Sequence, residues 1–257
     1  MSSRVVVLGS CGAWPEPRRA CTGFLFEHEG FRVVIDLGYD TLARLLENLG
    51  STTARGLDAV IITHRHPDHM NDLHGLFRAR WLGWPAAEAP ALPTYAAEGV
   101  RERVLGLEEH DTGAVDQVFD WHPLPAQAYQ VGPFRLESWL LPHQVPNAGV
   151  RLTTADGLVV AFTGDSGPSP DLVDLGRDAD LFIVDATDRP LGAPTAVDPV
   201  HLSAREAGEV AEVCGARRLL LTHFWPDHDR ALSLAAAQQV YSGEILLADE
   251  GAAIPLR

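Results

Sequence analysis

The sequence predicts an α/β fold in which two strand-rich halves are each flanked by helices. Short apolar runs of strand length recur along the chain and alternate with stretches whose apolar residues follow a helical period. Several of these runs end at loops that carry histidine or aspartate, and such loops are where functional side chains concentrate. With 257 residues and 46% hydrophobic content, residues 1–257 can form one domain with a sizeable core.

The first fifty residues begin with a strand and a Gly/Pro-rich loop. This loop contains neither the Gly-Lys-Ser/Thr nor the G-x-G-x-x-G pattern, so it is not a nucleotide phosphate loop. Alternating and β-branched residues predict strands, and leucines at helical spacing before Gly50 predict a helix. The expected elements are a strand over 5–8, a hairpin of strands 22–27 and 31–35, and a helix over 39–48.

The stretch 63–69 concentrates metal-binding side chains directly after the apolar run 59–62. Three imidazoles and one carboxylate fall within six residues. His64 and His66 are two apart on extended chain and project to the same side, and the proline that follows puts Asp68 where the N-cap of a helix would be. Four such side chains at this spacing indicate a metal site rather than a solvated loop. Imidazole with carboxylate suits zinc, or else manganese or iron.

The remaining elements follow from the same patterns, although residues 83–119 carry the weakest signals. Ser203 is a good helix N-cap, and Glu206 stands three residues later as its capping-box partner. The expected helices cover 71–81, 98–107, 204–213 and 231–240. The expected strands cover 92–95, 134–141, 158–162, 181–184, 217–222, 244–247 and 252–256.

Composition argues against several classes of protein. A net charge of −15 disfavours a long nucleic-acid footprint. The three cysteines are odd in number and lack metal spacing, which argues against a disulfide framework and favours a reducing compartment. No apolar run matches a signal-peptide core or the ~20 residues of a membrane span. We therefore expect a cytoplasmic protein that has no membrane partner.

The pattern His-x-His-x-Asp-His over 64–69 resembles the signature of the metallo-β-lactamase superfamily of binuclear hydrolases. The similarity extends over the whole chain, because each later ligand of that family has a counterpart at a strand end. It implies the superfamily's four-layer αβ/βα sandwich, with the metal site at the edge of two packed mixed sheets. The later counterparts are His143, Asp165 and His223.

The resemblance also implies a division of the seven ligands between two metal ions. Two zinc ions are expected, with manganese or iron as alternatives, and they would generate a bridging hydroxide that attacks the substrate. Asp165 would bridge the two ions. One ion would be held by His64, His66 and His143, and the other by Asp68, His69 and His223.

Three residues are candidates for catalytic roles. His201 matches the histidine that similar proteins place over the metals, where it would protonate the leaving oxygen; the alternative is a histidine on a loop surface. Asp185 stands where ribonuclease Z-like proteins commonly carry glutamate, and it would orient His201. Asp68, which belongs to the His-x-His-x-Asp-His signature, is the third candidate.

The opening loop resembles that of ribonuclease Z-like members, with Pro15 and Arg19 in matching places. Arg19 would meet an anionic substrate, or else form a surface salt bridge. Trp14 would line the pocket mouth, or else pack beneath the loop. Ser203, in the segment that follows His201, completes the candidate substrate contacts.

The branch of the family favours a phosphodiester as substrate. The tRNA-gripping arm of ribonuclease Z falls between the third-motif histidine and the bridging aspartate. Here only 21 residues, 144–164, separate those two positions, so the arm is missing. The acidic charge points the same way, because RNA binding relies on neutralising many phosphates. We expect a small-molecule anionic substrate, and tRNA is disfavoured.

Two other functions stay open from the sequence. One is a hydrolase of carboxylic esters, thioesters or lactones that uses the same hydroxide. The other is a non-catalytic metal-binding scaffold, although no ligand of the family is lost here. A true zinc β-lactamase is disfavoured because those enzymes do not use the aspartate bridge. A homodimer is compatible with the resemblance, since similar proteins commonly form one.

Overall fold

The computed structural model describes residues 3–84, 89–126, 128–188 and 199–256. Its strands form two sheets. The first contains β1 (Ser3–Gly9), β2 (Gly23–His28), β3 (Phe31–Ile35), β4 (Ala59–Ile62), β5 (Leu92–Ala97), β6 (Phe119–Leu124) and β14 (Ala253–Leu256). The second contains β7 (Tyr129–Val131), β8 (Phe134–Leu141), β9 (Asn147–Thr154), β10 (Val159–Phe162), β11 (Leu181–Asp185), β12 (Arg218–Thr222) and β13 (Glu244–Leu247).

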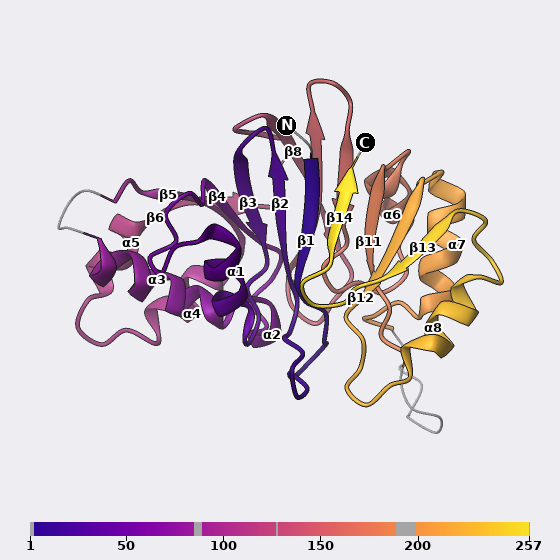
Figure 1. The fold of residues 1–257 in the computed structure, drawn as a ribbon, viewed down its shortest axis with the longest axis horizontal. Coiled ribbons are helices and arrows are strands. Elements are labelled where there is room, and N and C mark those ends of the chain that lie inside the picture. Colours follow the sequence, from indigo (N-terminus) through magenta and orange to yellow (C-terminus); the bar gives the residue numbers. More distant parts are fainter. Residues whose placement is uncertain (1–2, 85–88, 127, 189–198, 257) are drawn as a thin grey trace.

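The helices divide between the two halves in the same way. Those of the first half are α1 (Thr41–Leu49), α2 (Pro67–Met70), α3 (Asp72–Gly83), α4 (Val100–Leu105) and α5 (Thr112–Val118). Those of the second half are α6 (Asp171–Gly176), α7 (Ala204–Cys214) and α8 (Arg230–Ala237). Each group covers the outer face of its own sheet (Figure 1), which confirms the predicted four-layer αβ/βα sandwich. None of the described helices is long and apolar enough to cross a membrane.

Each sheet has seven strands and is mixed in direction. The orders are β14-β1-β2-β3-β4-β5-β6 and β13-β12-β11-β10-β9-β8-β7. Strands β3 to β6 run parallel in the first sheet, and β10 to β13 run parallel in the second. The carboxyl ends of these parallel strands lie at the lower edge in Figure 1. The loops that follow β4, β10 and β12 therefore meet there.

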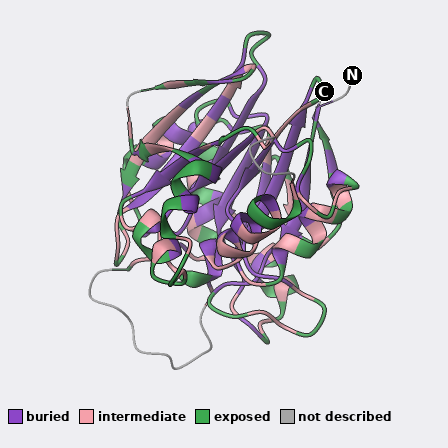
Figure 2. Ribbon diagram, turned by 90° about the vertical axis from the view of Figure 1, so that its left-hand side faces the viewer, coloured by how far each residue is buried: buried purple, intermediate pink, exposed green. Residues whose placement is uncertain are grey.

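Strand β1 is covered on both of its faces, which explains why its sequence is a continuous apolar run. Val5 and Val7 belong to the cluster between the two sheets, whereas Val6 and Leu8 belong to the cluster beneath the helices of the first half. Successive side chains of a strand point to opposite faces, so a strand that is covered on both sides is apolar throughout. Figure 2 shows the result, with buried strands inside and exposed residues on the outer helices.

Three local predictions are confirmed in detail. The hairpin of β2 and β3 turns at Glu29 and Gly30, which both have positive φ, at 52° and 91°. Ser203 caps α7 through a complete capping box with Glu206. Helix α1 ends at Gly50 in the left-handed conformation, as a C-terminal glycine favours.

The weak signals after residue 83 gave the least accurate predictions. The helix expected over 98–107 is shorter, and α5 and β6 were not predicted. Strand β6 lies at the edge of its sheet, where it pairs with β5 alone among the described strands, and several of its side chains are partly or fully exposed. An edge strand that contains Pro123 lacks the apolar run by which a buried strand is identified.

Candidate metal centre

Seven histidine and aspartate side chains from four segments of the chain meet at the lower edge of the two sheets. The loop after β4 supplies two of them and helix α2 supplies the next two, and the segments that follow β8, β10 and β12 supply one each. They form two groups that share Asp165, and within each group the ligand atoms lie within 4.8 Å of one another. The residues are His64, His66, Asp68, His69, His143, Asp165 and His223.

The first group consists of His64, His66 and His143 around one oxygen of Asp165. Oδ2 of Asp165 lies 3.7 Å from Nε2 of His64 and 3.6 Å from Nε2 of His143. Nε2 of His143 lies 3.0 Å from Nδ1 of His66. Three imidazoles thus converge on a common point, and strand β4 ends so that His64 and His66 reach it together.

The second group consists of Asp68, His69 and His223 around the other oxygen of Asp165. Oδ1 of Asp165 lies 3.0 Å from Nε2 of His69 and 3.3 Å from Nε2 of His223. Oδ2 of Asp68 lies 3.3 Å from Nε2 of His223. Asp165 therefore presents one carboxylate oxygen to each group, which is the geometry that a bridging ligand requires.

Asp68 does not occupy the N-cap position that the sequence suggested. Helix α2 begins at Pro67 with His66 as its N-cap, so Asp68 is the second residue of the helix. Proline is favoured at the first helical position because its missing N–H has no intrahelical partner there, and this moves the cap back by two residues. Asp68 then lies in the first turn, where the helix dipole favours its negative charge.

The charge states of the cluster suit cation binding. Burial alone would raise the pKa of Asp165 and of Asp68, but the surrounding histidines outweigh it and hold both carboxyl groups below their usual range. Burial lowers the pKa of His64, and it lowers that of His143 to about 4. In the first group, the ionised carboxylate of Asp165 therefore faces neutral imidazoles.

The second group shows the opposite shift on its histidines. Burial would lower the pKa of His69, but Asp165 and Asp36 raise it to about 10. The pKa of His223 is also raised, since Asp165 and its other carboxylate neighbours outweigh burial. These carboxylates attract positive charge, whether as a proton on an imidazole or as a metal ion among the ligands.

The unpaired polar atoms of the cluster provide a test of whether a metal fits. Nε2 of His64, Nε2 of His69 and Oδ1 of Asp165 are buried and have no hydrogen-bond partner in the described part of the chain. Buried polar atoms are nearly always satisfied, and metal coordination would satisfy all three. Imidazole nitrogen and carboxylate oxygen at these positions form a donor set suited to zinc, manganese or iron.

Asp36 holds the far side of His69. Its Oδ2 lies 2.7 Å from Nδ1 of His69, and Thr63 donates to it through both the backbone N–H and the hydroxyl. The backbone of Asp36 has a φ of 58°, an uncommon value for a residue other than glycine. Asp36 therefore has the contacts of a residue that orients the His69 ring.

A second buried carboxylate, Asp185 at the end of β11, serves two histidines. Its Oδ2 lies 2.8 Å from Nδ1 of His201. Its Oδ1 accepts a hydrogen bond from the Thr187 hydroxyl at 2.5 Å, and that hydroxyl lies 2.7 Å from Nδ1 of His223. The rings of His201 and His223 stack with their centroids 5.2 Å apart. His201 thus lies against the cluster.

Thr187 is the residue of this site that sequence reasoning missed. The available signal was its place two residues after Asp185, where a strand leaves the sheet toward the cluster. Because the Thr187 hydroxyl donates its hydrogen bond to the Asp185 carboxylate, its oxygen can accept a hydrogen bond from the Nδ1–H of His223. This hydrogen bond leaves Nε2 of His223 free toward Asp68 and Asp165.

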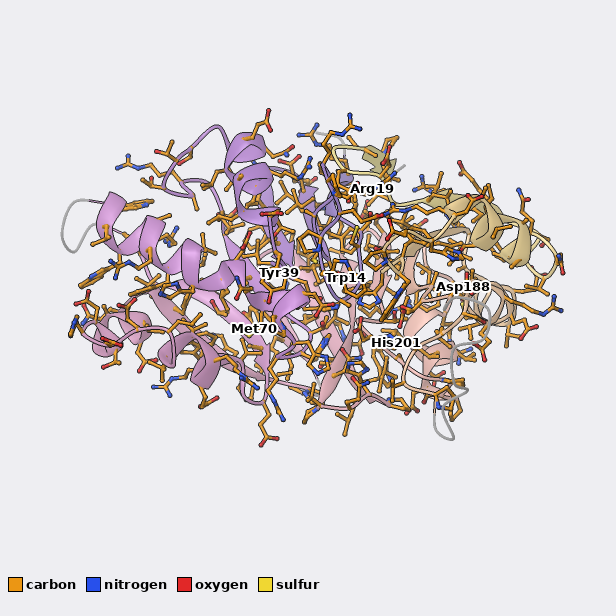
Figure 3. All side chains as sticks on the ribbon, turned by 90° about the horizontal axis from the view of Figure 1, so that it is seen from below. Trp14, Arg19, Tyr39, Met70, Asp188 and His201 are labelled. Atoms are coloured by element: carbon orange, nitrogen blue, oxygen red, sulfur yellow. The ribbon has the colours of Figure 1, made fainter. Side chains whose placement is uncertain are left out.

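The three predicted substrate contacts lie in different surroundings. Trp14 is 47% exposed and is drawn close to His201 in Figure 3, which looks onto this edge of the sheets. The guanidinium of Arg19 forms ion pairs with Asp249 and Glu250, so it has the contacts of the salt-bridge alternative. The hydroxyl of Ser203 is engaged in the capping box of α7.

Comparisons with known proteins agree with this geometry. Residues 31–224 match the family described as the beta-lactamase superfamily domain. A probable metallo-hydrolase, YhfI of Bacillus subtilis, is 30% identical over 253 residues, which cover 96% of this chain and 98% of the relative. The crystal structure of YhfI, a metallo-beta-lactamase fold protein, gives a TM-score of 0.84 at 26% identity and covers 99% of this chain and 100% of that one. A ribonuclease Z of Kineococcus radiotolerans is 28% identical over 92% of this chain and 89% of its own length.

Proposed function

Since the chain belongs to the metallo-β-lactamase superfamily and resembles its ribonuclease Z-like members, we propose that it is a binuclear metal-dependent hydrolase of a small phosphodiester. The observation that carries the proposal is Asp165, whose two oxygens face two separate groups of ligands. His64, His66 and His143 would hold one ion, and Asp68, His69 and His223 the other. Two divalent ions bound there would supply an activated water and stabilise charge on the attacking and leaving oxygens.

The residues around the cluster support distinct roles in the reaction. Nδ1 of His201 is engaged by Asp185, so Nε2 is the nitrogen left to give a proton to the leaving oxygen. Asp185 fixes the orientation of the His201 ring through this contact. The N–H of Ala13 donates to Oδ2 of Asp68 at 2.7 Å, which holds that carboxylate in place.

A small diester is favoured over RNA by the course of the chain beside the site. Strands β9 and β10 pair antiparallel and are joined by a turn of four residues, 155–158. No long arm is inserted between His143 and Asp165, and the net charge of −15 disfavours a polyanion. The name ribonuclease Z on similar sequences supports phosphodiester chemistry. A carboxylic ester, thioester or lactone hydrolase with the same residues is the second candidate.

The test compares two chromogenic substrates on the metal-loaded protein. Initial rates are measured with a p-nitrophenyl phosphodiester and a p-nitrophenyl carboxylic ester. Asp165→Ala serves as the blank, and Asp156→Ala, in the exposed turn between β9 and β10, is the matched control. We expect phosphodiester turnover that disappears in the blank and persists in the control. Turnover of the carboxylic ester alone would favour the second candidate, and turnover of neither ester with metal retained would favour a binding scaffold.

A further inference from the structure

Trp14 is an exposed aromatic side chain beside the candidate metal centre. Nearly half of its surface is open, at 47%, although large aromatic side chains are usually buried for most of their area. Its ring contacts that of Trp225, with the centroids 5.2 Å apart and the planes at 81°. Trp225 thus supports Trp14, and much of the Trp14 indole remains exposed to solvent.

The backbone just before Trp14 is fixed to the ligand cluster itself. Gly12 lies so close to the ring of His223 that a Cβ at that position would be 2.6 Å from it. Ala13 donates its N–H to Asp68 and has a φ of 62°, a left-handed conformation that costs energy for alanine. The conformation of this loop is therefore set by two residues of the second ligand group, and Trp14 follows directly.

The surroundings of Trp14 place it at the rim of the cluster. In Figure 3 it lies between Tyr39 and His201. Gly38, the residue before Tyr39, lies so close to Asp68 that a Cβ at that position would be 1.9 Å from the Asp68 carbonyl oxygen, so Tyr39 is on the side of the second ligand group. Trp225 comes two residues after His223 and belongs to the same rim. Aromatic side chains thus flank one side of the site.

We propose that Trp14 forms a subsite that stacks on a planar aromatic ring of the substrate. The substrate would then be a phosphodiester with such a ring on one ester group, either a nucleobase or a simple aryl group. The phosphate part of this inference rests on the proposed function, but ring binding can be measured separately. Stacking suits this position because an exposed indole held from one side offers a flat apolar surface without requiring hydrogen-bond partners.

The experiment measures calorimetric dissociation constants of phosphate monoesters on the metal-loaded protein. AMP, phenyl phosphate and ribose 5-phosphate share a phosphate group, and only the first two carry an aromatic ring. Stacking of a base on an aromatic side chain contributes ~1–3 kcal/mol, so we expect ring-bearing ligands to bind roughly 5–150-fold more tightly than ribose 5-phosphate. Trp14→Ala should bring that ratio close to one and leave ribose 5-phosphate binding unchanged.

Two further variants make the result specific. Trp14→Phe should keep part of the preference, because a smaller ring remains. Trp81→Ala, an exposed tryptophan on α3, is the matched control and should keep all of it. A preference for AMP alone identifies a nucleobase, whereas an equal gain for phenyl phosphate identifies any aryl ring.

Equal binding of all three ligands by the unaltered protein would overturn the proposal. So would a Trp14→Ala variant that loses affinity for all three alike, because Trp14 would then only support the loop on Asp68. These outcomes differ from failure of the proposed function. A protein that prefers ring-bearing phosphates but hydrolyses no phosphodiester would retain the ring subsite and refute the phosphodiesterase.

Discussion

Nδ1 of His69 lies 2.7 Å from Oδ2 of Asp36, and both side chains are fully buried. Because Thr63 donates two further hydrogen bonds to Asp36, the carboxylate cannot rotate without losing three hydrogen bonds. The ring of His69 is therefore fixed with its Nε2 toward Asp165. A histidine ligand is usually oriented by such a carboxylate on its other nitrogen.

Replacing Asp36 should weaken metal binding without removing any ligand. In Asp36→Ala, His69 loses its orienting partner, and zinc affinity should fall by roughly 10–100-fold. Competition with a chromophoric chelator measures the affinity. Asp180→Ala is the control, since Asp180 is also buried but pairs with Arg217. An equal loss of affinity in both variants would mean that the effect is general destabilisation.

Thr187 should act through the orientation of His223. Thr187→Val keeps the shape of the side chain and removes the hydroxyl between Asp185 and His223, so metal affinity should again fall by about 10–100-fold. Thr187→Ser keeps the hydroxyl and should bind metal like the unaltered protein. Chelator competition measures the metal affinity of the unaltered protein and of both variants. A serine variant that binds metal as weakly as the valine variant would contradict this role of Thr187.

His201 should affect turnover and not metal content. We expect His201→Ala to retain its metal and to lower turnover by the ~10²–10⁴ typical of losing a general acid. Metal analysis and rates with the chromogenic ester are measured together. His122→Ala, a partly exposed histidine that stacks on Tyr95, should leave both unchanged. Unaltered turnover in His201→Ala would remove His201 from the mechanism.

Ser203 should be a stability residue. Its hydroxyl caps α7, so Ser203→Ala should lower the free energy of unfolding by about 0.5–2 kcal/mol and leave KM unchanged. Ser203→Thr retains a capping hydroxyl and should recover most of the loss. Urea denaturation and steady-state kinetics separate the two roles, because a raised KM at unchanged stability would identify a substrate contact.

The three cysteines should be unreactive in the folded protein. All are buried and free, and burial raises the pKa of Cys11 to about 11 and raises those of Cys21 and Cys214. Only the thiolate reacts with iodoacetamide, so labelling at about pH 8 should be slow in buffer and fast in urea. Fast labelling in buffer would show that the thiols are accessible.

Cys11 should also contribute to the loss of stability at alkaline pH. Its pKa in the folded protein is raised above the ordinary value of 9.0. The contribution of the protonated Cys11 thiol to the free energy of unfolding is therefore complete below about pH 9, and it is lost as the pH rises through about 11. Unfolding free energies measured over this range should fall less steeply in Cys11→Ala than in the unaltered protein. An equally steep fall of the unfolding free energy with pH in both proteins would contradict the raised pKa of Cys11.

Local residue patterns were enough to predict the fold class and most of the strands and helices. Apolar runs such as β4 and β10 are covered on both sides, so burial requires the residue pattern that identifies them. The spacing of His64, His66 and Asp68 marks one loop as a candidate metal site, because side chains so close in sequence must also be close in space. Elements with little burial, such as the edge strand β6, lack this pattern and could not be predicted from it.

Which distant side chains share a function depends on strand pairing and on how the two sheets pack. The two oxygens of Asp165 face different ligand groups because parallel strands of one sheet end beside the loop of the other sheet. Thr187 meets His223 because β11 and β12 are neighbours within one sheet and end side by side. Contacts across 36 residues leave no periodic trace in a sequence. They arise when strands pair and sheets pack, because these two steps fix where each strand ends.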